Sequence, residues 1–219
     1  MSLVIIDSGS GNLRSVQKSL ESTRSAGQRG ESITVSSDPR IIAAASRLVL
    51  PGQGAFRSVA LGLESHEGLM AAMTEAVIGR GVPLLGICVG MQIMVTSGRE
   101  NGNHRGLGWL SGECLAIAPA VGIKIPHMGW NNLSLTAQGR GHPLLRGIAD
   151  GDHAYFVHSY VVDLAEPSHL LATCEVGPGE DTRLTAMIGR DNICGTQFHV
   201  EKSQATGLKI LENFWQWTP

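Results

Sequence analysis

The sequence predicts an α/β fold with a doubly wound, mostly parallel central sheet, helices on both faces and an antiparallel extension. Short apolar runs alternate with amphipathic stretches through the first two-thirds of the 219-residue chain. From about Leu107 onward, shorter strand-like runs are separated by Gly, Asn and Pro turns, which favours antiparallel pairing. The chain shows no internal repeat, linker or low-complexity segment, so we expect one domain over residues 1–219.

The first half of the chain supplies the predicted parallel strands and the helices that cover them. Leu3–Asp7 is an apolar run that ends on an acidic residue, which indicates a buried strand rather than a signal peptide. Pro83–Ile87 is apolar throughout, as in the buried middle of a parallel sheet. The other elements expected here are strands at Ile33–Val35 and Leu48–Leu50 and helices at Asn12–Ser25 and Leu69–Arg80.

The second half supplies the predicted antiparallel strands and one last helix. The expected strands are Cys114–Ala118, Asn132–Leu135, Ala154–Val157, Leu170–Thr173, Thr185–Ile188 and Ile193–Phe198. The chain then continues into an amphipathic helix over Ser203–Trp217, with Ser203 as its predicted N-cap.

The composition excludes several classes of function. A net charge of −2 gives no basic excess for a nucleic-acid surface, and no apolar run approaches the roughly 18 residues that a membrane helix needs. The four cysteines show no CxxC spacing, so the sequence supports neither a zinc site nor a disulfide framework. Cys114, Cys174 and Cys194 lie in apolar, strand-like surroundings and are predicted to be buried. We therefore expect a cytoplasmic protein.

The fourth cysteine lies in a different setting. Pro83–Ile87 leads into Gly86-Ile87-Cys88-Val89-Gly90, and a helix-compatible segment, Met91–Thr96, follows. This layout is typical of a nucleophile elbow with Cys in place of Ser, because side chains beside so sharp a turn would clash. The helix start favours the thiolate of Cys88, and the N–H of Val89 points to where an oxyanion would form. Taken alone, the motif is equally compatible with a structural turn.

A base and its orienting carboxylate are predicted near the end of the chain. A nucleophilic cysteine needs a base, and His199 follows the predicted strand Ile193–Phe198. Residues two apart in an extended segment point the same way, so Glu201 is expected to hold the imidazole in one tautomer. A His-x-Glu pair alone is usually a surface strand end. Combined with a cysteine elbow about 110 residues earlier, it predicts a Cys88–His199–Glu201 triad.

These two motifs carry a family resemblance. Gly86–Gln92, GICVGMQ, and Gly195–Ser203, GTQFHVEKS, resemble the class I, triad-type glutamine amidotransferases. Pro126–Asn131, PHMGWN, and Tyr155–Tyr160, YFVHSY, are more specific and resemble the glutaminase subunits of imidazole glycerol phosphate synthases. The resemblance covers the whole chain, and it implies the flavodoxin-like fold of class I amidotransferases.

The resemblance also implies roles for further residues. Gly52 and Gln53, in the loop after Leu48–Leu50, are expected to supply the second oxyanion donor facing Val89 once the loop peptide reorients. By itself this Pro-Gly loop is equally an ordinary β-turn. Substrate glutamine is expected to contact Gln92 and a pocket formed by Ser159, Tyr160 and Glu100.

Three positions depart from the family pattern. Val200 replaces the usual Pro between His199 and Glu201, and we expect a small effect on stability because Val suits an extended segment. Ser8 replaces a common aromatic residue, and Val89 replaces a usual Leu. Val89 is expected to act through its backbone, and none of the three changes touches the predicted triad.

The resemblance implies a partner but no cofactor or metal. The expected partner is a cyclase subunit with a (β/α)8 barrel fold, which receives ammonia and forms a heterodimer with this chain. Met128, Trp130 and Lys202 are predicted to lie at the interface; the alternatives are a core aromatic for Trp130 and a solvated charge for Lys202. Two other functions stay open at this point: the glutaminase of anthranilate, guanylate or pyridoxal phosphate synthesis, and a non-catalytic binding module.

Overall fold

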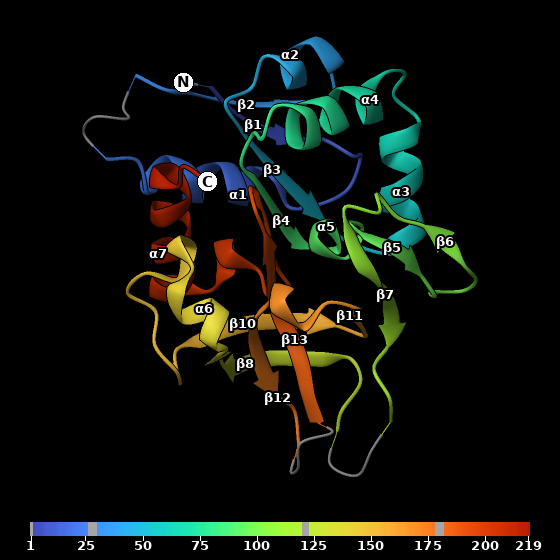
Figure 1. Cartoon of the computed structure of the whole chain (residues 1–219), viewed down its shortest axis with the longest axis vertical. Coiled ribbons are helices and arrows are strands. Elements are labelled where there is room, and N and C mark those ends of the chain that lie inside the picture. The colour runs from blue at the N-terminus through green and yellow to red at the C-terminus, as the bar shows by residue number, and fades with distance from the viewer. Residues whose placement is uncertain (1, 26–29, 120–122, 178–181) are drawn as a thin grey trace.

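The computed structural model describes residues 2–25, 30–119, 123–177 and 182–219, and its centre is an eight-stranded sheet (Figure 1). The strand order is β2-β1-β3-β4-β14-β13-β12-β9. These strands are β1 (Ser2–Ile6), β2 (Ser32–Ser36), β3 (Arg47–Gly52), β4 (Leu84–Cys88), β9 (Ser134–Leu135), β12 (Leu170–Glu175), β13 (Arg183–Arg190) and β14 (Ile193–Thr196). Strands from β2 to β14 are parallel, and β13, β12 and β9 are added antiparallel. The predicted fold class is confirmed.

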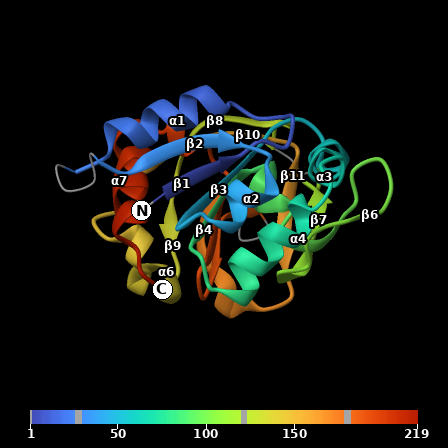
Figure 2. The ribbon, with the colours of Figure 1, turned by 90° about the horizontal axis from the view of Figure 1, so that it is seen from above.

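Helices cover both faces of the parallel half. Figure 2 shows α1 (Leu13–Ser22) and α7 (Gln204–Gln216) on one face, and α2 (Pro39–Ala43) and α4 (Leu69–Thr74) on the other. Next to α4 lies α3 (Phe56–Glu64), while α6 (Ala137–Gly141) packs on β12. The apolar sides of α1 and α7 are buried, which explains why both were recognisable from their periodicity. No helix in the described ranges has the length and apolar character that crossing a membrane requires.

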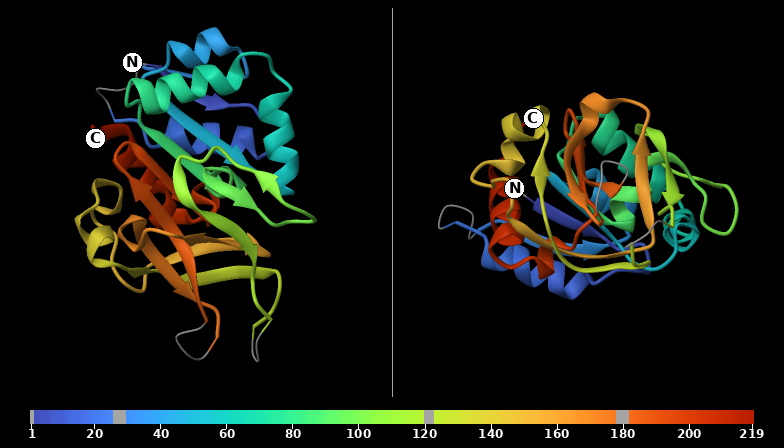
Figure 3. Two further views of the ribbon diagram at one scale, coloured as in Figure 1. Left: turned by 45° about the vertical axis from the view of Figure 1, so that its right-hand side comes forward. Right: turned by 90° about the horizontal axis from the view of Figure 1, so that it is seen from below.

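Two smaller sheets complete the fold. One has the order β11-β7-β5-β6, and the other pairs β10 with β8. Their strands are β5 (Val95–Gly98), β6 (His104–Arg105), β7 (Leu110–Ala116), β8 (His127–Asn132), β10 (His153–His158) and β11 (Tyr160–Leu164). The β8–β10 pair lies with β12 and β13 at the end of the molecule away from α2 and α4 (Figure 3). The carboxyl ends of β3 and β4 point toward it (Figure 1).

Three predicted elements differ in the structure. The predicted helix Leu69–Arg80 is α4 followed by a π-helical turn, η2 (Glu75–Gly79). The predicted strand Asn132–Leu135 is the end of β8 and the separate strand β9. The segment Met91–Thr96 is not one helix: α5 (Val89–Gln92) is a single turn, and the chain is extended again in β5. Ile93, Val95 and Thr96 are β-branched, which disfavours continuing the helix.

Short 3-10 turns connect several elements of the second half. They are η3 (Pro143–Leu145), η4 (Pro167–His169) and η6 (Val200–Lys202). The last of these joins β14 to α7 directly after His199. It therefore determines how the predicted base and its carboxylate are presented.

Candidate active site

Cys88 is the last residue of β4, at a sharp turn of the backbone. Its φ of 55° and ψ of −114° are unfavourable for a residue with a Cβ, as at other nucleophile elbows. A Cβ on Gly90 would lie 1.8 Å from the Leu50 oxygen, and one on Gly86 would lie 2.6 Å from the backbone oxygen of Gly90. Both flanking glycines are therefore required sterically, as expected from the motif.

The helix that follows Cys88 is shorter than the sequence suggested. α5 contains four residues, a single turn whose dipole is small, and the expectation that the helix start favours the thiolate of Cys88 stays a prediction. The start of α5 still offers backbone N–H groups that are free to bind an oxyanion. The first N–H groups of a helix have no partner within it, and Val89 is the first residue of α5. Stabilisation of a charged sulfur must come mainly from side chains around it.

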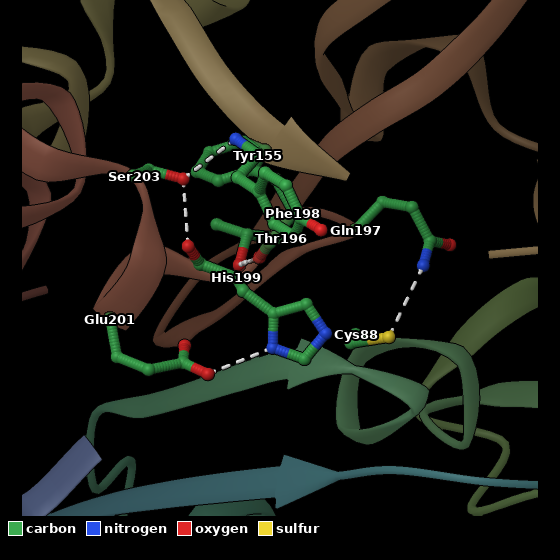
Figure 4. Close-up of polar contacts among 8 residues, drawn as sticks. All are labelled: Cys88, Tyr155, Thr196, Gln197, Phe198, His199, Glu201 and Ser203. Carbon is green, nitrogen blue, oxygen red and sulfur yellow. Dashed lines mark hydrogen bonds and ion pairs between the residues drawn. The ribbon is translucent and has the colours of Figure 1, made fainter. Parts of the chain in front are cut away.

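His199 and Glu201 form a buried pair beside Cys88. His199 Nδ1 lies 2.8 Å from Glu201 Oε1, with side-chain exposures of 4% and 1%. The rest of the imidazole faces Cys88 (Figure 4). The predicted contact is present, but the extended geometry expected for it is wrong, because Glu201 and Val200 belong to the 3-10 turn η6. A tight turn brings the carboxylate back onto the ring.

The surroundings of His199 favour its charged form. Burial alone lowers the pKa of this imidazole, but the hydrogen bonds that the ring donates to the Cys88 and Glu201 side chains, with the charges of those two groups, outweigh burial and raise the pKa to about 9. The ring is therefore an imidazolium near neutral pH. An imidazolium beside a cysteine favours the thiolate, which is the reactive form.

The side chain of Ser203 holds the base in place rather than capping the last helix. Its Oγ donates to the His199 oxygen at 2.7 Å and accepts from the Tyr155 N–H at 2.9 Å (Figure 4). Ser203 is the N-cap residue of α7, as predicted, but its side chain makes no capping hydrogen bond to the start of that helix. The His199 N–H donates in turn to the Tyr155 oxygen at 3.0 Å. These three bonds fix the His199 backbone to β10.

The sulfur of Cys88 faces a cavity of about 300 Å³. The cavity is lined by residues from six parts of the chain, namely Gln53, Gly54, Cys88, Val89, Gln92, Glu100, Pro126, Val157, His158, Ser159, Tyr160 and His199. Every predicted substrate-pocket residue is in this lining, as are Gln53 and Val89 of the predicted oxyanion hole. Gly52 and Glu201 lie behind it: Gly52 pairs with Cys88 across β3 and β4, and Glu201 contacts the far side of His199.

Glu100 has a second contact that the motif did not indicate. Its Oε2 accepts a hydrogen bond of 2.7 Å from the N–H of Phe56, the first residue of α3. The carboxylate thus satisfies a free N–H at a helix start and holds the end of the Gln53–Gly54 loop. Glu100 lines the cavity and also positions one of its walls.

Two polar residues near the cavity had no predicted role. Gln197 is fully buried, and its Nε2 lies 3.7 Å from Cys88 Sγ (Figure 4). His158 Nδ1 donates to the Tyr160 oxygen at 2.8 Å, and burial lowers the pKa of His158 to about 4, so this ring is neutral. The spacing of two residues between Gln197 and His199 is the one sequence signal that could have revealed Gln197.

A larger cavity of about 560 Å³ lies elsewhere in the fold. It is bounded by α3, α4 and the Arg105–Trp109 segment, and none of the predicted site residues lines it. We assign the candidate site to the smaller cavity, because that cavity contains a strained cysteine and a perturbed histidine together. In the described part of the chain, no group of three or more His, Cys, Asp or Glu side chains is arranged to hold a metal ion.

The three predicted interface residues lie on one outward surface next to the site. Met128 and Trp130 are 62% and 47% exposed on β8, which excludes a core position for Trp130. Trp130 packs edge-on against Tyr155 with ring centroids 5.9 Å apart, and Lys202 Nζ lies 6.0 Å from the same Tyr155 ring. Val157, which pairs with Met128, also lines the cavity. We call Met128, Trp130, Tyr155, Val157 and Lys202 the β8–β10 surface.

The sequence matches a known family over almost its whole length. The model of the class-I glutamine amidotransferases covers residues 4–217. The chain belongs to this family. The amidotransferase is 49% and 48% identical to the imidazole glycerol phosphate synthase subunits HisH of Rhodospirillum rubrum and Ruegeria pomeroyi, each over 220 residues, 100% of this chain and 100% of the relative. A crystal structure of a glutamine amidotransferase is 14% identical, covers 97% of both chains and has a TM-score of 0.70, which supports the fold alone. The predicted resemblance is confirmed.

Proposed function

We propose that this amidotransferase is the glutaminase subunit of an imidazole glycerol phosphate synthase, with Cys88, His199 and Glu201 as its catalytic residues in a single domain. The observation that carries the proposal is the strained Cys88 beside the buried His199–Glu201 pair, open to a cavity of amino-acid size. The identity of 49% to a HisH subunit over the full length supports the pathway. The reaction is hydrolysis of glutamine to glutamate and ammonia.

The first half of the reaction is acyl transfer to sulfur. The Cys88 thiolate attacks the side-chain carbonyl carbon of glutamine, and the electron pair of the carbonyl moves onto its oxygen. The N–H groups of Val89 and Gln53 receive this oxyanion. His199 then gives its Nε2 proton to the leaving nitrogen, the C–N bond breaks, and ammonia departs, leaving a glutamyl thioester.

The second half regenerates the enzyme. Neutral His199 takes a proton from water, and the resulting hydroxide attacks the thioester carbon. The C–S bond breaks, glutamate leaves, and Cys88 returns to the thiolate beside an imidazolium. Glu201 stays ionised throughout and stabilises the charged ring through its 2.8 Å contact. No metal or organic cofactor takes part in these steps.

Ammonia is the product that a partner consumes. In this proposal the partner is a cyclase subunit with a (β/α)8 barrel fold, which forms a heterodimer with this chain. It uses ammonia to make imidazole glycerol phosphate and aminoimidazole carboxamide ribotide. The β8–β10 surface is the proposed interface, because an exposed apolar surface with a Trp anchor favours protein association. Its Val157 leads into the cavity, so ammonia has a short route to the partner.

The same proposal includes a cytoplasmic location. Four unpaired cysteines, all buried, suit a reducing compartment.

The deciding experiment measures glutamate release in three steps. The chain is assayed alone, then with the cyclase, and then with the cyclase and its nucleotide ligand. We expect a stepwise rise that is absent in Cys88→Ala. No glutamate with saturating cyclase and ligand would contradict the catalytic proposal, and retained activity in Cys88→Ala would contradict the nucleophile. Binding of a chorismate-using partner instead of the cyclase would favour the anthranilate pathway.

The interface is tested by matched truncations of exposed apolar side chains. Trp130→Ala is expected to weaken cyclase binding by at least about tenfold, as is typical for a buried aromatic anchor. Ile41→Ala is the control, because Ile41 is 39% exposed on α2, at the opposite end of the molecule (Figure 1). Equal cyclase affinity for both variants, measured by calorimetry, would place the interface elsewhere.

A further inference from the structure

A chain of three hydrogen bonds links the nucleophile to the opposite wall of the cavity through Gln197. Gln92 Nε2 donates to the Tyr160 oxygen at 3.1 Å and to Gln197 Oε1 at 3.0 Å. Gln197 Nε2 then donates to Cys88 Sγ at 3.7 Å. The chain crosses from α5 and β11 to the segment after β14, and it ends on the reacting sulfur.

The direction of every bond in this chain is fixed by one backbone carbonyl. The Tyr160 oxygen can only accept, so the Gln92 atom next to it must be the NH₂ group. The Gln197 atom that meets this NH₂ group must then be the carbonyl oxygen. The remaining end of the Gln197 amide, facing Cys88, is therefore an N–H donor. The O and N atoms of both amides are therefore assigned from their hydrogen-bond partners.

This direction has consequences at both ends of the chain. At Cys88, an N–H aimed at the sulfur stabilises the thiolate more than the thiol, because a charged acceptor forms the stronger hydrogen bond. At Gln92, both hydrogens of the amide are already bonded to the Tyr160 and Gln197 oxygens. Gln92 can then offer a ligand in the cavity only its carbonyl oxygen, which is an acceptor.

A polar side chain at position 197 costs free energy of desolvation unless its polar atoms form hydrogen bonds. Gln197 is fully buried, and its backbone N–H is held at 2.8 Å by the Ala186 oxygen of β13. An apolar side chain of similar size would avoid the desolvation of an amide in this position. α5 contributes little as a dipole, so donors from side chains matter more for the sulfur.

We propose that Gln197 is a positioning residue with two separable effects: its N–H holds the Cys88 thiolate, and its carbonyl oxygen locks Gln92 as an acceptor for a donor group of the amino-acid substrate. The proposal rests on the proposed glutaminase function for its substrate. Its first effect concerns the free chain alone.

Two substitutions separate these effects. Gln197→Glu keeps an oxygen for Gln92 but replaces the N–H at Cys88 by a carboxylate oxygen. Gln197→Met has nearly the same length and loses both groups. Gln138→Glu is the matched control, since it makes the same change on an exposed part of α6. Circular dichroism and urea unfolding establish that each variant is folded.

The first measurement is the pH dependence of Cys88 alkylation by iodoacetamide, read by mass spectrometry on the peptide that contains Cys88. This measurement needs neither glutamine nor cyclase. Its result can therefore contradict the role of Gln197 while the glutaminase proposal holds, and it can support that role even if the glutaminase proposal is wrong. The other titratable groups around the sulfur are the same in every variant, namely His199 with its partner Glu201, Glu100, His158, Tyr160 and Cys114. Differences therefore report residue 197.

We expect the half-maximal pH of alkylation to rise by about one to two units in both Gln197 variants and to stay unchanged in Gln138→Glu. In the complex with cyclase, Gln197→Glu should lower kcat with nearly unchanged KM for glutamine. Gln197→Met should lower kcat and also raise KM, by at least about threefold, because Gln92 is no longer locked. Unchanged alkylation profiles in both folded variants would overturn the effect on the thiolate. Equal KM values in Gln197→Met and the wild type would overturn the lock on Gln92.

Discussion

The charge of His199 offers the sharpest test of the site. In the folded chain the pKa of this imidazole is raised from 6.5 to about 9, which corresponds to about 3 kcal/mol in favour of the imidazolium. Burial lowers the pKa of His199. The hydrogen bonds and charges of Cys88 and Glu201 must therefore stabilise the imidazolium by more than this net amount. Glu201→Gln removes one of these two charges without changing the size of the side chain.

The sign of the stability effect follows from the direction of the change in pKa. A group whose pKa is higher in the folded state stabilises the fold fully below its unfolded pKa of 6.5. This contribution is lost as the pH rises through about 9. In Glu201→Gln, we expect the pKa of His199 to fall by about one to three units, since an opposite charge in contact has an effect of that size. The loss of stability between pH 6.5 and 9.5 should shrink accordingly.

Two assays check this prediction. NMR titration of the His199 ring gives its pKa directly, and urea unfolding at pH 6.5 and 9.5 gives the change in unfolding free energy. Glutaminase kcat with cyclase is expected to fall on the order of 10³-fold, because an amide can hold the wrong tautomer of His199. Glu212→Gln, which breaks an exposed 3.0 Å ion pair with Lys209, is the control. An unchanged pKa of His199 in Glu201→Gln would refute the reasoning.

Three further substitutions test the elbow and the turn beside it. Cys88→Gly should be about 1 kcal/mol more stable than Cys88→Ala in urea, because glycine tolerates the φ of 55°, and neither variant should release glutamate. Gly90→Ala should lose more than about 3 kcal/mol of stability, because its Cβ would lie 1.8 Å from a backbone oxygen of β3, whereas Gly141→Ala has open space and should cost far less. Val200→Pro should be about 0.5 to 1 kcal/mol more stable than the wild type, because Val200 is the first residue of η6, where proline fits. Its glutaminase activity should stay within twofold of the wild type. A drop in the unfolding temperature would contradict this prediction.

Local patterns predicted the parallel half of the fold well. Apolar runs that end in turn residues correspond to β1, β3 and β4, because a strand buried on both faces must be apolar throughout. The details after the elbow were not predictable from local pattern. Met91–Thr96 contains helix formers and β-branched residues together, and the chain turns there because β5 pairs with β7, a distant segment.

The candidate site was predictable as far as its residues lie in short motifs. Cys88, His199 and Gln92 have recognisable neighbours, and the structure places all three on one cavity. The role of Ser203 was not predictable, because its partners Tyr155 and His199 come together only through tertiary structure. The role of Gln197 was not predictable for the same reason. A buried amide looks like any polar residue in a sequence until its acceptors are known.

The position of β14 in the sheet has a consequence for how the protein is made. β14 lies between β4 and β13, yet it is synthesised last of the eight strands. Until residues 193–196 are in place, no strand lies between β4 and β13, and each of them has one open edge. A chain released early therefore exposes two strand edges that can pair with other chains. Such a chain would also contain Cys88 without His199.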